Sequence, residues 1–191
     1  MPAMRAKLGG AYHDRGFNDA SECLLVFLEA VFDADPSLAQ RLDVRHRETY
    51  RDSANQERRL GDVGDNAVQH LVTCTVDEFG KPLTGRVVRL NWVDVQTTLT
   101  WSRTSELLAF HILNRTASTQ RLQWCDSMLI NEQSYALEGV IVGVHGHYVY
   151  FYKGEAGWVR IDNHKVTLVR ALLVQSESER YGYVFVYQQE Q

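Results

Sequence analysis

The sequence is poor in cysteine, in proline and in long apolar runs. It has three cysteines and three prolines in 191 residues. Three scattered cysteines cannot form a disulfide framework, so a reducing compartment, the cytoplasm or the nucleus, is expected. The longest apolar stretch, residues 140–144, is far too short to cross a bilayer. The first 17 residues carry charges without an apolar core, so no secretory signal and no membrane partner are expected.

A surplus of basic charge is also missing. The net charge is −4 and the pI is about 6.0, which argues against a nucleic-acid partner. Zinc needs four nitrogen or sulfur ligands. His70 and Cys74 supply two, with no second pair in the sequence, so no metal is expected. Leu8-Gly9-Gly10 lacks the strand, lysine and helix of a phosphate loop, and no cofactor is expected.

The length and an apolar share of 45% predict one soluble domain over residues 1–191. Residues 1–40 are its predicted helical part. Asp19-Ala20-Ser21-Glu22 has the form of a capping box, and Pro36 is expected to end the helix that follows. Apolar residues recur at helical spacing behind the cap and predict one broad buried face: Leu24, Phe27, Leu28 and Val31.

The remainder divides into a charged segment and a β-rich part. Residues 41–66 are rich in Arg, Asp, Glu and Gln and are expected to be solvated and partly mobile. In residues 67–191, alternating and β-branched stretches separated by turn signals predict strands. These strands cover residues 70–76, 83–93, 99–101, 107–113, 135–144, 148–153, 158–162, 166–169 and 181–187. The predicted class is α+β with an antiparallel C-terminal sheet.

Two residues of this sheet are candidates for acid–base chemistry. His147 and Asp162 lie at similar distances from the predicted hairpin turn at residues 154–157. Residues equally distant from a turn face each other, so we expect a hydrogen bond between their side chains on adjacent strands. An imidazole oriented by a carboxylate is what a nucleophile-activating base requires. The alternative is a surface histidine beside a surface aspartate, which is common in strands.

Four stretches of the sequence resemble the catalytic domain of the ubiquitin-specific proteases. Residues 135–141 leading to Gly146-His147-Tyr148 resemble the histidine box of that family. Trp158-Val159-Arg160-Ile161-Asp162-Asn163 resembles its Trp-x-x-Phe-Asp-Asp segment. Residues 181–187 resemble its closing strand, and residues 18–24 are similar to its Gln-Asp-Ala-x-Glu-Phe-Leu helix. The resemblance is specific in the last fifty or so residues and weak in the middle.

This resemblance implies a papain-like cysteine protease fold of the ubiquitin-specific protease type. It implies that His147 is the general base and that Asp162 is its orienting carboxylate. Asn163 stands where the family usually has a second aspartate near the oxyanion region. An asparagine amide can still donate and accept hydrogen bonds there.

The nucleophile of the family is missing from its expected place. The cysteine box precedes the Asp-Ala-x-Glu helix in that family, whereas here only 18 residues precede it and none is cysteine. The fold is therefore expected to be incomplete at its N-terminus. Cys23 is expected to be a buried core thiol, and Cys125 has no glycine turn or asparagine beside it. Cys74 falls where the family often begins a zinc knuckle, here without its partner.

Three functions remain open at this point. The first is an inactive pseudo-deubiquitinase that binds other proteins as a scaffold in a larger complex, with ubiquitin as a candidate ligand. The second is a fragment or split form of an active thiol-dependent deubiquitinase. The third is a fold that serves neither ubiquitin nor catalysis. We expect no hydrolysis by this chain alone. We also expect a partner to cover the apolar stripe of the first helix.

Overall fold

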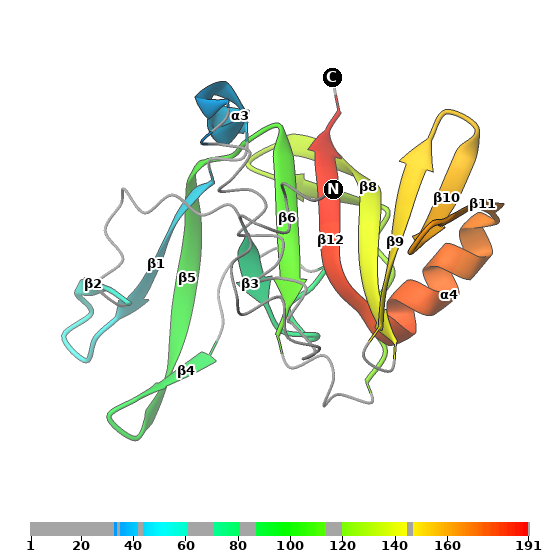
Figure 1. The fold of residues 1–191 in the computed structure, drawn as a ribbon. Coiled ribbons are helices and arrows are strands. Elements are labelled where there is room, and N and C mark those ends of the chain that lie inside the picture. Colours follow the sequence, from blue (N-terminus) through cyan, green and yellow to red (C-terminus); the bar gives the residue numbers. More distant parts are fainter. Residues whose placement is uncertain are drawn as a thin grey trace.

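The structure is a computed structural model that describes Asp33 and residues 35–41, 44–60, 71–80, 87–113, 120–144 and 147–190. Within these ranges the chain is mostly β-strand, arranged in two sheets (Figure 1). The predicted helix with Leu24, Phe27, Leu28 and Val31 lies outside the described residues, as do Cys23 and the corner at residues 145–146.

The first sheet has four strands in the order β2-β1-β5-β4, and the second has eight, with β11-β10-β9-β8-β12-β6-β3 in line and β7 paired to β8. The elements are α3 (Pro36–Arg41), β1 (Arg45–Arg51), β2 (Glu57–Arg59), β3 (Val72–Cys74), β4 (Val87–Leu90), β5 (Val93–Arg103), β6 (Leu107–Ile112), β7 (Ser127–Ile130), β8 (Gln133–Val144), β9 (His147–Gly154), β10 (Gly157–Asp162), β11 (Lys165–Val169), α4 (Ala171–Tyr181) and β12 (Gly182–Gln189). All strand pairs are antiparallel except β3 with β6.

The four-stranded sheet was not predicted as such. The described part of the charged segment, residues 44–60, forms β1 and β2 rather than an irregular stretch. Asp52 organises the turn between them, because its Oδ1 accepts the N–H groups of Ala54 and Gln56 at 2.9 Å each. Asn91 and Trp92, with φ of 47° and 70°, break the predicted strand over residues 83–93 into β4 and β5. Two successive positive φ angles are typical of a type I′ hairpin turn.

Helix α3 begins at Pro36, where the sequence predicted a helix end. Proline is favoured at the first helical position. Asp35 caps the helix, since its Oδ1 accepts the backbone N–H and the hydroxyl of Ser37 at 3.0 and 2.6 Å.

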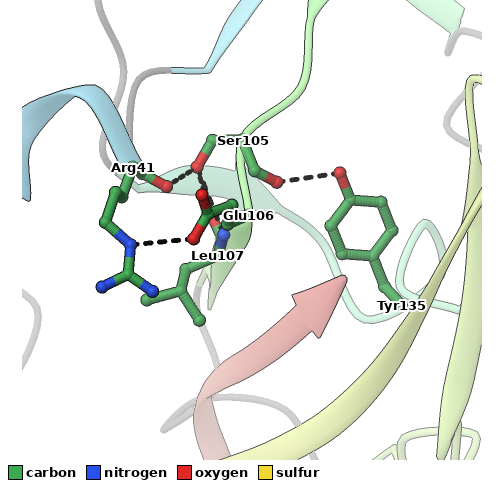
Figure 2. A network of polar contacts seen from close by, with 5 residues as sticks. All are labelled: Arg41, Ser105, Glu106, Leu107 and Tyr135. Carbon is green, nitrogen blue, oxygen red and sulfur yellow. Dashed lines mark hydrogen bonds and ion pairs between the residues drawn. The ribbon is translucent and has the colours of Figure 1, made fainter. Parts of the chain in front are cut away.

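Figure 2 shows how α3 contacts the connection between β5 and β6 and, through Ser105, Tyr135 of the eight-stranded sheet. Arg41 Nε lies 2.8 Å from Glu106 Oε2. The hydroxyl of Ser105 contacts the Arg41 carbonyl, and the carbonyl of Ser105 accepts a hydrogen bond from the Tyr135 hydroxyl at 2.8 Å. Because Ser105 lies in the connection between β5 and β6 and Tyr135 lies on β8, this network holds α3 and that connection against the eight-stranded sheet.

The hydrophobic core lies against the eight-stranded sheet. Its largest completely buried side chains come from β6, β8, β9, β12 and α4: Phe110, Ile112, Tyr135, Leu137, Val140, Val142, Phe151, Val174, Phe185 and Tyr187. The rings of Phe79 and Phe185 pack against each other at a tilt of 39°, with centroids 4.3 Å apart. Helix α4 packs against β8, β10 and β12 through Val174.

Helix α4 was not predicted from the sequence. It directly precedes Gly182, whose N–H donates to the Ser178 carbonyl at the helix end. A Cβ at position 182 would lie 2.5 Å from that carbonyl oxygen and 2.4 Å from the ring of Phe185. Only glycine therefore fits between the end of α4 and the start of β12.

Candidate functional site

The candidate site lies at the end of the β9–β10 hairpin. Residues 154 and 157 pair next to the turn, and Tyr150 pairs with Ile161. Continuing this register places Asp162 opposite Val149, and His147 becomes its diagonal neighbour on the same face. The His147 Nε2 atom lies 2.7 Å from Asp162 Oδ1. The predicted hydrogen bond between these residues on adjacent strands is confirmed.

Asp162 uses its two carboxylate oxygens for different partners. Oδ1 binds His147, while Oδ2 lies 2.9 Å from Nη2 of Arg160. The hydrogen bond from His147, followed by the positive charge of Arg160, lowers the pKa of Asp162 below its usual value. Asp162 is therefore ionised at neutral pH. Arg160 was not predicted as a site residue, although its position two residues before Asp162 puts both on one face of β10.

The ionised carboxylate determines which nitrogen of His147 can act as a base. A carboxylate only accepts hydrogen bonds, so neutral His147 must carry its proton on Nε2. Nδ1 then holds the lone pair, and no described residue donates a hydrogen bond to it. The His147 side chain is 46% exposed, so this nitrogen can be reached by another group. The arrangement can accept a proton from a thiol, a hydroxyl or a water molecule.

Asn163 lies next to this pair, in the turn between β10 and β11. Its φ of 53° is in the left-handed region, which asparagine tolerates better than most residues. Its Nδ2 lies 3.4 Å from Asp162 Oδ1, a long contact compared with that of His147. The structure thus brings His147, Asp162 and Asn163 together, and it adds Arg160.

Cys125 lies at the far end of β8 from His147. The carbonyl of its neighbour Asp126 accepts the N–H of Leu137, whereas His147 pairs with Val144. From position 137 to position 144 a strand extends about 23 Å, at about 3.3 Å per residue. Burial raises the pKa of Cys125, which disfavours the thiolate. Cys125 therefore cannot serve His147 as a nucleophile in this fold.

Cys74 is excluded by distance and by burial. It lies on β3, four strands away from β9, which corresponds to roughly 19 Å at about 4.8 Å per strand. Its side chain is 1% exposed. Burial, with a smaller effect of Glu78, raises the pKa of this thiol to about 12. Cys74 is thus a core residue.

Two further observations concern only the described part of the chain. It contains no group of three or more His, Cys, Asp or Glu residues placed to hold a metal ion. It also contains no helix with the length and apolar character needed to span a membrane.

Known proteins resemble this chain in their fold and not in their sequence. No family model matches the sequence, and no curated protein matches it. A structure of the yeast SAGA DUBm with a mutant Sgf73 superposes with a TM-score of 0.56 at 12% identity. A structure of the SAGA DUB module with Ubp8, Sgf11, Sus1 and Sgf73 gives a TM-score of 0.57, also at 12% identity. Each match covers 80% of this chain and 42% of the matched chain.

At this identity the likeness concerns the fold alone. It supports the predicted ubiquitin-specific-protease-like fold, with antiparallel sheets as its main component. The chain spans 42% of the length of the chains it matches.

Proposed function

We propose that this chain is a deubiquitinase-like domain of the papain-like type that binds other proteins and does not cleave ubiquitin conjugates by itself. The observation that carries this proposal is an assembled His147–Asp162 pair with neither Cys74 nor Cys125 within reach. A base without a nucleophile leaves only weak residual catalysis. His147, Asp162 and Asn163 are then the remnant of a catalytic site.

The proposed partner is another protein of a larger complex, and ubiquitin is the candidate ligand. The similar structures are modules built from several proteins, which favours a complex here as well. The proposed location is the cytoplasm or the nucleus, in line with the sparse cysteines.

A second function is favoured by the hydrogen-bonded arrangement of His147 and Asp162. Both oxygens of Asp162 are engaged, and His147 is held with Nδ1 available as a base. A thiol supplied by another segment or another chain would complete a cysteine protease site. In that case the domain is the histidine-bearing half of an active deubiquitinase.

The experiment that separates these functions uses the full 191-residue chain and ubiquitin with a fluorogenic C-terminal leaving group. We expect no turnover above that of the His147→Ala variant, together with binding of unmodified ubiquitin or of a complex partner in a titration. Turnover by the isolated chain that is lost in His147→Ala contradicts the first proposal. Loss in Cys23→Ala or Cys125→Ala as well would then identify the nucleophile. Turnover found only in a purified complex, and lost with His147→Ala, supports the second function.

A further inference from the structure

We infer that Arg160 is a positioning residue that fixes the carboxylate of Asp162 and, through it, the tautomer and orientation of the His147 ring. The inference rests on the proposed function insofar as His147 is the base of the site.

The geometry of Asp162 carries the first step. Its side chain ends in a bond between sp³ and sp² carbons, about which rotation is broad and nearly two-fold. Binding to His147 alone would leave Oδ2 without a described protein partner and the carboxylate able to turn. The Arg160 Nη2 atom, 2.9 Å from Oδ2, holds the carboxylate plane in the orientation in which one oxygen contacts Arg160 and the other contacts His147. A carboxylate oxygen therefore stays directed at Nε2 of His147.

The strands hold Arg160 in place for this contact. Arg160 pairs with Phe151, which is completely buried, and its side chain is 29% exposed. Asp162 and Arg160 therefore stand side by side on the face of β10 that continues into the core. Asn163 is a weaker alternative for this role, because its only contact with the carboxylate is the 3.4 Å approach to Oδ1.

The contact between Arg160 and Asp162 matters more for the orientation of the carboxylate than for the stability of the fold. Partly exposed ion pairs contribute little to the free energy of folding. The planar guanidinium of arginine, however, is a directional donor, whereas a lysine ammonium acts as a point charge. An arginine at this position keeps Asp162 turned toward Nε2 of His147, and Nδ1 remains the nitrogen that can accept a proton.

The test is the tautomer of His147, read from long-range proton–nitrogen correlation spectra of the ¹⁵N-labelled full chain at neutral pH. His147→Gln assigns the signals. We expect a single tautomer with the proton on Nε2 in the wild type. Asp162→Ala removes the acceptor and should show mixed tautomers. Arg160→Gln should shift the spectrum toward that of Asp162→Ala, and Arg160→Lys should shift it less than Arg160→Gln does. Arg89→Gln is the control, because it removes an arginine from the Arg89–Asp94 pair of the other sheet and should change nothing.

The inference is overturned if Arg160→Gln keeps the wild-type pattern, if Asp162→Ala also keeps it, or if the wild type shows mixed tautomers. Amide spectra of each variant report whether the fold is retained, and Arg160→Lys preserves the charge should Arg160→Gln unfold. The readout needs no enzymatic activity. A failure of the proposed function in the ubiquitin assay therefore leaves the tautomer result standing, and the reverse also holds.

Discussion

The two sheets of this protein are stabilised in different ways. The eight-stranded sheet carries the hydrophobic core, with residues such as Phe110 and Phe185 almost completely buried. In the four-stranded sheet, Thr49 and Thr97 are the only buried side chains among those described. Its turns carry hydrogen bonds to Asp52 and the partly exposed ion pairs Arg58–Asp52 and Arg89–Asp94, and each such pair adds only a little stability. The candidate site lies in the well-packed sheet, where a buried strand face can fix its side chains.

The largest expected difference between the sheets is their response to truncation. Phe185→Ala should lower the free energy of unfolding by about 3–5 kcal/mol, because it leaves a cavity beside Phe79. Thr98→Ala, at an exposed position of β5, should cost less than about 1 kcal/mol. Urea unfolding measures both. Equal losses would mean that the two sheets do not differ in this way.

The second-largest expected effect comes from removing the hydrogen bond between the Tyr135 hydroxyl and the Ser105 carbonyl. Tyr135→Phe should destabilise the protein by about 1–3 kcal/mol, because the Ser105 carbonyl loses its donor in a buried place. Tyr152→Phe is the matched control, since Tyr152 is 45% exposed, and should have almost no effect. If thermal unfolding finds the same midpoint for both variants, the network does not contribute to stability.

A gain in stability is expected at the tip of the four-stranded sheet. Trp92 has a φ of 70° and a side chain that is 92% exposed. A Cβ in the left-handed region costs about 1–2 kcal/mol, and the extra chain entropy of glycine offsets part of that cost. Trp92→Gly should therefore raise the free energy of unfolding by roughly 0.5–1 kcal/mol, as in the favoured Asn-Gly hairpin turn. Trp92→Ala keeps the strained backbone and should not raise the free energy of unfolding. If Trp92→Ala raises it as much as Trp92→Gly does, the gain comes from loss of the indole and the prediction is wrong.

Acid should loosen the β1–β2 turn by a small amount. The hydrogen bond from the Gln56 backbone, and next that from Arg58, lower the pKa of Asp52 below its ordinary value of 3.8. A carboxylate with a lowered pKa in the folded state stabilises the fold above pH 3.8. That contribution is lost as the pH falls through the lowered value. The amide signals of Ala54 and Gln56 should titrate in this range and should not do so in Asp52→Asn. Titration at or above pH 3.8 would contradict this prediction.

The strands of the large sheet could be predicted from the sequence because alternating residues and turn glycines that lie close together in the chain specify them. Alternation in residues 148–153 and the glycines at 154 and 157 specify a hairpin, and the hairpin specifies that His147 approaches Asp162. The resemblance to a known family pointed to the same two residues. Arg160 was missed because an arginine in a strand is equally typical of a solvated surface. Its alternation with Asp162 was the available signal.

The small sheet and α4 could not be read in the same way. Strands β1 and β2 consist mainly of charged and polar residues, and their pairing depends on the turn built by Asp52. In α4 the buried residues are Val174 and Ser178, while Leu172 is 75% exposed, so no apolar stripe marks the helix. Tertiary contacts and turn geometry determine where the strands of the small sheet and helix α4 form. The hydrophobic pattern of the sequence does not reveal either feature.

The proposal that His147 has no nucleophile beside it can be tested directly. The full chain is incubated with ubiquitin that carries a thiol-reactive electrophile at its C-terminus, and the intact mass is recorded with the His147→Ala variant as the reference. We predict no covalent adduct in either protein, because Cys74 and Cys125 lie far from His147. A stoichiometric adduct that maps to Cys23, Cys74 or Cys125 and disappears in His147→Ala would contradict the account.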